Sequence, residues 1–159
     1  MRIDEIALNL EAVETGVKFL PDGPDGGWIQ LRSMHSVRFQ MALEKRQRRY
    51  AAVLEQRTEE AFKLRQQLTR ETAAEDLVVS WSDSKTDADA PPCFTDSGKK
   101  EIPFSVDNAR MLFCDRRYQP VWAFVDRSAS GSEEFRESTF TSGPIEDLGK
   151  DSETGSVAT

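Results

Sequence analysis

The feature that most constrains the fold is a long run, residues 33–75, that contains neither proline nor glycine. Ala, Leu, Glu, Lys, Arg and Gln dominate this run, and all six are strong helix formers. Their spacing predicts one amphipathic helix over about residues 34–81, or two helices with a break. Arg57 interrupts the apolar stripe, so the run is not a continuous coiled-coil seam. The stripe comprises Phe39, Leu43, Tyr50, Val53, Leu54, Ala61, Leu64 and Leu68.

The segment before this helix predicts β-structure within about residues 3–33. Two short apolar segments, Val17–Phe19 and Ile29–Leu31, flank the turn-forming sequence PDGPDGG. Its glycines adopt positive φ at little steric cost. We therefore predict a β-hairpin or small antiparallel sheet, with a further strand near Ile6–Leu10.

The second half of the chain predicts a loop, short helices and a tail. Residues 82–101 are rich in Ser, Asp and Pro, which is typical of an exposed loop. Ser105 suits an N-cap, so two or three short helices are expected across residues 105–136. Residues 138–159 hold too little apolar surface to offset their ordering entropy, which predicts a disordered tail. The remainder forms one α+β domain over residues 1–137.

Charge and hydropathy exclude several classes of partner. The chain of 159 residues carries a net charge of −7, which argues against general nucleic-acid binding. No apolar run approaches the roughly 20 residues needed to cross a bilayer. The N-terminus also lacks the basic start and continuous apolar segment of a signal peptide. We therefore expect a soluble cytoplasmic protein with no nucleic-acid or membrane partner.

Catalytic chemistry finds little support in the sequence. Cys93, Cys114 and the single His35 are too few to supply the usual four ligands of a structural zinc site. The glycine-containing turn matches neither a phosphate-binding loop nor a dinucleotide-binding fingerprint. No nucleophile and base can be assigned as a pair. We expect no enzymatic activity, no cofactor and no metal.

Aromatic residues late in the chain are the candidates for partner binding. Trp81 and Phe104 are assigned to the core, because a small domain has few other large apolar groups. Phe113, Tyr118 and Trp122 lie on the short helices and are predicted to contact a partner, with Tyr118 and Trp122 the better surface candidates.

The long helix has a charge bias of its own. Between Glu44 and Arg70 there are eight basic and four acidic residues, within a chain of net charge −7. The favoured interpretation is a solvated face with i,i+4 ion pairs such as Glu59–Lys63. The alternative is an electrostatic contact for an acidic partner.

Several short motifs follow one another over roughly residues 14–136. They are Glu14-Thr15-Gly16, Val17–Leu20, Pro21-Asp22-Gly23, Ile29–Ser33, Leu77–Trp81 and Pro103–Ala109, followed by a last helix and Phe135. Their order resembles the tail assembly chaperones of long-tailed (siphophage-type) bacteriophages. The loop from Ser82 to Glu101 is longer and more acidic than in that pattern.

The resemblance implies a non-enzymatic role. Proteins of that family bind the tape measure protein, keep its long helices soluble and help to recruit tail tube subunits. They act in the host cytoplasm and are absent from the mature virion. A homo-oligomer, as a ring or a filament, is compatible with coating a long client. Two alternatives are a tail completion or connector protein retained in the virion, and an inhibitor of a host protein.

Overall fold

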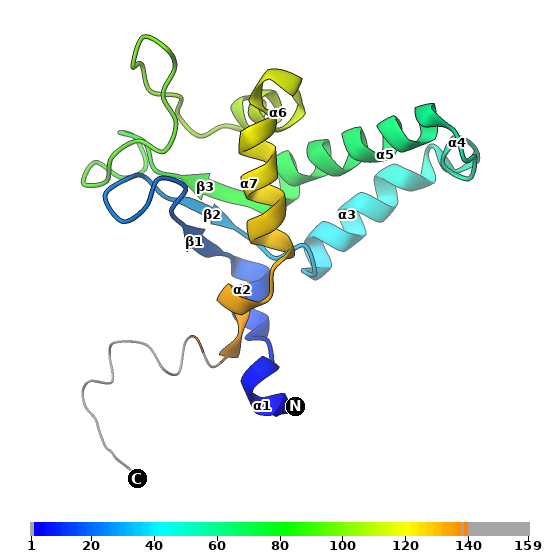
Figure 1. The fold of residues 1–159 in the computed structure, drawn as a ribbon, viewed down its shortest axis with the longest axis horizontal. Coiled ribbons are helices and arrows are strands. Elements are labelled where there is room, and N and C mark those ends of the chain that lie inside the picture. Colours follow the sequence, from blue (N-terminus) through cyan, green and yellow to red (C-terminus); the bar gives the residue numbers. More distant parts are fainter. Residues whose placement is uncertain (1, 138, 140–159) are drawn as a thin grey trace.

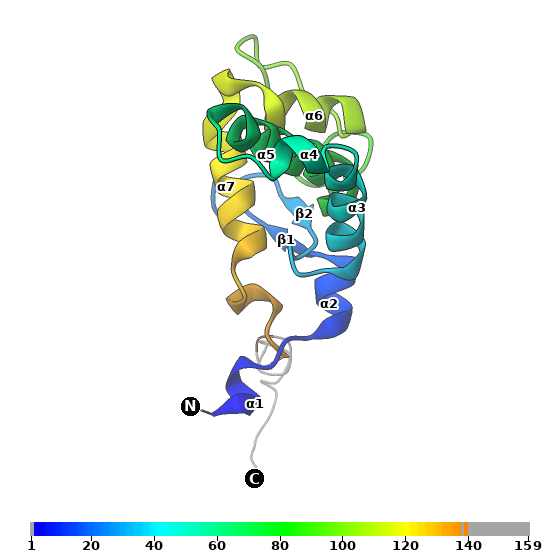
Figure 2. The ribbon, with the colours of Figure 1, turned by 90° about the vertical axis from the view of Figure 1, so that its right-hand side faces the viewer.

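The computed structural model describes residues 2–137 and 139 and has an α+β fold (Figure 1). A small sheet lies at the centre, a pair of helices projects to one side, and two later helices pack near the sheet (Figures 1 and 2). The helices are α1 (Ile3–Ile6), α2 (Leu10–Thr15), α3 (Val37–Arg48), α4 (Ala51–Leu54), α5 (Glu59–Thr72), α6 (Val106–Cys114) and α7 (Gln119–Ser130). The strands are β1 (Val17–Phe19), β2 (Ile29–Leu31) and β3 (Val78–Trp81).

The sheet is antiparallel, with strand order β1-β2-β3. Ile29 in β2 lies opposite both Phe19 in β1 and Trp81 in β3. The register between β2 and β3 shifts at Gln30 and Leu31, which marks a β-bulge. The predicted hairpin over residues 17–31 is therefore confirmed.

The residues before this hairpin correct one prediction. The prediction of a strand near Ile6–Leu10 is wrong, because α1 ends at Ile6 and α2 begins at Leu10. The residues between them form an isolated β-bridge, from Leu8 to Arg136. Asn9 accounts for the start of α2, since its side-chain oxygen accepts a hydrogen bond from Ala12 N at 3.1 Å.

The long helix expected over residues 34–81 is broken. Chain reversal around α4 separates α3 from α5, and the two pack against each other. Thr58 starts α5 by accepting a hydrogen bond from Ala61 N at 3.1 Å. The interpretation as two helices is thus the right one, because the reversal packs α3 against α5, and Phe39 and Leu68 are buried. We call α3, α4 and α5, residues 37–72, the helical arm.

The last residues of the expected helix form other structure. A single π-helical turn, η1 (Ala73–Leu77), follows α5, and Val78–Trp81 then extends as β3. Adjacent valines favour a strand, because β-branched side chains pack well on a pleated surface.

The core lies between the sheet, the base of the arm and the two later helices. Trp81 is fully buried between Phe94 and Phe104, with ring centroids 5.0 and 5.1 Å away in edge-on geometry. Phe104 is half-buried and packs against the same core. The assignment of Trp81 and Phe104 to the core is confirmed.

The segment 82–101 is a loop, but its start is not exposed. Asp83 is buried, and its carboxylate accepts hydrogen bonds from the backbone N–H groups of Lys85, Thr86 and Phe104 at 2.7–2.8 Å. Burial alone would raise the pKa of Asp83, but these backbone bonds lower it below its ordinary value. Asp83 therefore ties the loop to the residues that precede α6.

The short helices expected across residues 105–136 are confirmed. Ser105 caps α6 by accepting a hydrogen bond from Asn108 N at 3.0 Å. Two single 3₁₀ turns complete the set, η2 (Arg116–Tyr118) and η3 (Glu133–Phe135). The tail predicted over residues 138–159 lies outside the described residues, apart from Thr139.

Candidate functional site

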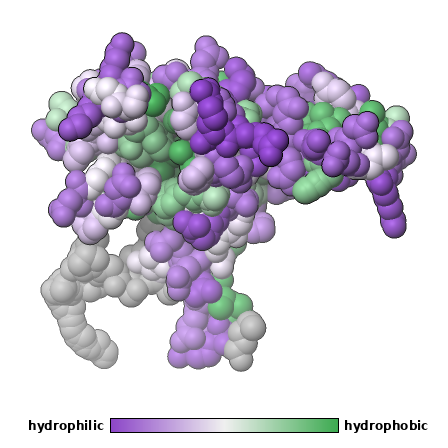
Figure 3. Space-filling model, turned by 45° about the horizontal axis from the view of Figure 1, so that its top comes forward, coloured by the Kyte–Doolittle hydropathy of each residue, from purple (hydrophilic) through white to green (hydrophobic). Residues whose placement is uncertain are grey.

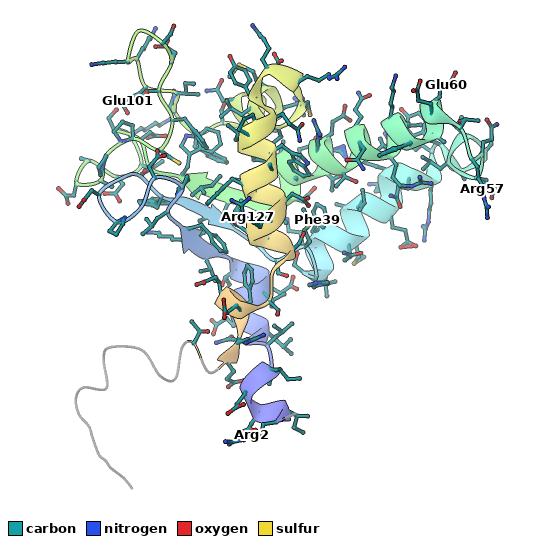
Figure 4. All side chains as sticks on the ribbon, in the orientation of Figure 1. Arg2, Phe39, Arg57, Glu60, Glu101 and Arg127 are labelled. Carbon is teal, nitrogen blue, oxygen red and sulfur yellow. The ribbon has the colours of Figure 1, made fainter. Side chains whose placement is uncertain are left out.

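The helical arm exposes both apolar and basic side chains. It extends away from the sheet, with Arg57 and Glu60 at its far end and Phe39 at its base (Figure 4). Apolar patches interrupt its hydrophilic surface (Figure 3). Val37, Met41 and Phe62 are 62%, 65% and 52% exposed, although each belongs to a residue type that usually packs in a core. An arm of this kind offers contact area that its own fold does not use.

A groove of about 610 Å³ lies between α5 and the corner where α6 meets α7. We call it the arm groove. Its first wall comes from α5, whose lining positions recur at i, i+4 and i+8 and so share one helix face. They are Phe62, Lys63, Gln66, Gln67 and Arg70. The second wall consists of Cys114, Arg116 and Gln119.

Arg70 forms the base of the groove and joins its two walls. Its Nη2 donates a hydrogen bond to Gln119 Oε1 at 2.9 Å, and its guanidinium carbon lies 5.5 Å from the centre of the Trp122 ring. The Arg70 Nε is buried without an acceptor among the described residues. Arg70 therefore makes a cation–π contact with Trp122, whereas a buried arginine usually pairs with a carboxylate.

Arg116 contributes a second unneutralised cation. The adjacent acid, Asp115, is bound instead by Arg117, whose Nη2 lies 2.6 Å from the carboxylate. The hydrogen bond from Arg117 lowers the pKa of Asp115 and keeps this acid charged. Within residues 2–137, Arg116 has no ion pair and its side chain is exposed. Its charge thus remains available to a partner.

The remaining groove residues are polar or weakly apolar. Lys63 pairs with Glu59 at 3.4 Å, but both side chains are more than 70% exposed, so this pair contributes little. Gln67 donates a hydrogen bond to Glu71 at 2.9 Å. Burial, followed by the charge of Glu71, raises the pKa of the Cys114 thiol, which keeps it neutral. The groove therefore combines the exposed ring of Phe62 with two guanidinium groups, those of Arg70 and Arg116, that have no ion pair among the described residues.

A second hollow of about 390 Å³ lies beside η1, and the acidic side chains that line it are already paired with arginines. Glu75 accepts hydrogen bonds from Arg46 on α3 and from Arg110 on α6, the latter at 3.1 Å. Asp76 pairs with Arg38 at 3.1 Å. These bonds join the arm to the core, so we assign this hollow a structural role.

Of the three aromatic residues predicted to bind a partner, two are buried and one is half-buried. Phe113 is fully buried and Trp122 is 4% exposed, with their ring centroids 5.8 Å apart. The expectation that Trp122 is a surface residue is therefore wrong, because α6 and α7 pack through this pair. Tyr118 is half-buried against the same core. Partner binding by these three side chains stays an untested prediction.

Phe62, Arg70 and Arg116 were not singled out as site residues from the sequence. One signal for Phe62 was present, since it lies next to Ala61 and outside the apolar stripe predicted from the sequence. The basic bias between Glu44 and Arg70 was also visible. The proximity of Arg116 to α5 depends on tertiary packing and left no local signal.

In residues 2–137, no cluster of three or more His, Cys, Asp or Glu side chains is arranged to hold a metal ion. No helix in the described part of the chain combines the length and apolar character that a membrane span requires.

Comparison with protein-family models gives one match, to the YdaY prophage protein family over residues 34–142. This match covers more than half of the chain. The chain belongs to the YdaY prophage protein family. The matched residues include the whole helical arm and every residue that lines the arm groove. The family match confirms the prediction that the chain is a phage-derived protein.

No curated protein and no solved structure matches the chain significantly. The role as a tail assembly chaperone stays a prediction.

Proposed function

We propose that this YdaY-family protein is a tail assembly chaperone that binds the helices of the tape measure protein in the host cytoplasm. In this role it keeps that client soluble, helps to recruit the major tail tube protein, and leaves before the virion is complete. The observation that carries the proposal is the projecting helical arm with exposed Val37, Met41 and Phe62. Amphipathic helices of a client bind such apolar surfaces through residues at i, i+3, i+4 and i+7.

The physical requirements of a holding chaperone agree with the remaining features. A net charge of −7 favours solubility of the complex. Met41 is unbranched and polarisable, so it adapts to varied apolar partners. The arm is anchored to the core through Glu75, which bonds Arg46 and Arg110, so its exposed face is presented by a fixed support.

Co-expression with the tape measure protein of the same prophage tests the proposal. The wild-type chain should move most of the tape measure protein into the soluble fraction and should co-purify with it. An arm variant with Val37, Met41 and Phe62 each changed to Gln should lose this effect. Gln preserves helix propensity while removing apolar contact area.

The matched control changes three other exposed apolar residues that lie outside the arm, Ile3, Leu10 and Leu20, to Gln. This control should solubilise the client as the wild type does. Equal aggregation of the tape measure protein with and without the chain would refute the chaperone role. Mass spectrometry of purified particles addresses the retained-component alternative, because a chaperone should be missing from them.

A further inference from the structure

The arm groove differs in charge from the protein that carries it. Arg70 and Arg116 lie on its two walls, and neither has an acidic partner among the described residues. The chain as a whole is acidic, with a net charge of −7. The acids beside the groove, Glu59 and Glu71, bond Lys63 and Gln67 rather than the two arginines. Because the Debye length is about 8 Å at physiological ionic strength, a bound segment senses Arg70 and Arg116 more strongly than acids elsewhere on the chain. The groove is therefore electrostatically suited to an acidic occupant.

The dimensions and apolar content of the groove favour a helix. From Phe62 to Arg70 the α5 wall rises by about 12 Å, at roughly 1.5 Å per residue, which corresponds to about two turns of a partner helix. Phe62 at one end is 52% exposed and can receive an apolar side chain. Arg116 on the second wall is exposed and can receive a carboxylate through bidentate hydrogen bonds.

We propose that the arm groove binds an acidic, amphipathic helical segment of the client, with an apolar side chain on Phe62 and a carboxylate on Arg116. This inference rests on the proposed chaperone function for the identity of the client, and it adds the chemistry of the recognised segment. Nucleic acid is disfavoured as the occupant, because the chain carries more acidic than basic residues.

The test uses the full-length chain and fluorescein-labelled 25-residue peptides that tile the tape measure protein. Fluorescence anisotropy at about 150 mM salt should identify bound peptides that carry net negative charge and apolar residues at helical spacing. Phe62→Gln and Arg116→Gln should each weaken their binding by about tenfold, as expected of side chains that carry much of the binding energy. Leu20→Gln, a substitution at a residue of similar exposure outside the groove, should have no effect.

A charge-reversal pair makes the assignment of Arg116 specific. Arg116→Glu should abolish binding of the acidic peptide and restore binding of a peptide whose Glu and Asp residues are changed to Lys. Arg116 is the appropriate site because it is exposed, whereas Arg70 also packs on Trp122 and its replacement would disturb the core. Circular dichroism confirms that each variant is folded.

Several outcomes would overturn the inference. They are binding confined to neutral or basic peptides, binding that survives in Phe62→Gln and Arg116→Gln, and no peptide binding at all. Competition by a 20-residue oligothymidine would assign the groove to nucleic acid. Sedimentation showing an oligomer that Phe62→Gln dissociates would assign it to a second copy of the chain. If the tape measure protein is still solubilised in any of these cases, the chaperone function stands and only the groove assignment fails.

Discussion

Arg70 stacks its guanidinium group on the indole ring of Trp122, with its central carbon 5.5 Å from the ring centre. This contact links the surface of the arm groove to the buried interface between α6 and α7. Phe113 lies on the opposite helix, with its ring centroid 5.8 Å from that of Trp122. The aromatic pair therefore joins α6 to α7, and Arg70 connects this pair to α5.

Replacing Trp122 should reveal this structural role. Trp122→Ala removes a large side chain that is 4% exposed and should lower the free energy of unfolding by about 3–5 kcal/mol. Tyr118→Ala, at a half-buried neighbour, should cost less than about 1.5 kcal/mol. Urea denaturation followed by circular dichroism measures both. If both variants lost an equally small free energy of unfolding, Trp122 would not be a packing centre of the interface between α6 and α7.

Asp83 should make stability depend on pH. Its pKa lies below the ordinary value of 3.8, so its contribution is fully present above that value and is lost as the pH falls through the lowered pKa. Asp83→Asn replaces an acceptor of three backbone N–H groups and should cost about 2–3 kcal/mol at pH 7. The difference from the wild type should shrink below pH 3.8.

Asp89→Asn is the control for this prediction, because Asp89 lies in the same loop with an exposed side chain. Its unfolding free energy should match that of the wild type at both pH 7 and pH 3. A constant difference between Asp83→Asn and the wild type across this range would contradict the charged state assigned to Asp83.

Glu75 should couple the arm to the core. The hydrogen bond from Arg46 is the largest cause of its lowered pKa, with a further bond from Arg110. Glu75→Gln weakens both bonds, but the side chain is 36% exposed, so solvent screening limits the loss to about 1 kcal/mol. The lowered pKa means that this stabilisation is present at neutral pH and declines in acid. Hydrogen exchange should show faster opening of α3 than of β2 in this variant, and uniform acceleration would contradict the coupling.

The parts of the fold that were predictable have local causes. The side chain of Ser105 caps the start of α6 by a local hydrogen bond. The turn between β1 and β2 is specified by its prolines and glycines. The strand β3 was not predicted, because Val78 and Val79 follow directly on a helical pattern, and Leu31, the β2 partner of Val78, is distant in the sequence. Tertiary pairing here overrides the local periodicity.

The candidate site was less predictable for the same reason. Basic residues on α5 were evident, but their assembly with Arg116 requires α6 and α7 to fold back against the arm. Trp122 was expected at the surface because its helix is short and late in the chain. The fold instead buries it, since Phe113 offers a complementary ring from α6.

Thiol labelling should report occupancy of the groove. Burial raises the pKa of Cys93 to about 12, and burial also raises that of Cys114, so neither forms the reactive thiolate readily at neutral pH. Cys114 lines the groove and is half-buried, so a disulfide reagent at pH 8 should label it slowly, and Cys93 only on unfolding. A bound client peptide should slow the labelling of Cys114 further. Cys114→Ser should eliminate the slow phase and leave the unfolding-dependent one. Unchanged labelling of Cys114 in the presence of saturating peptide would place the peptide outside the groove.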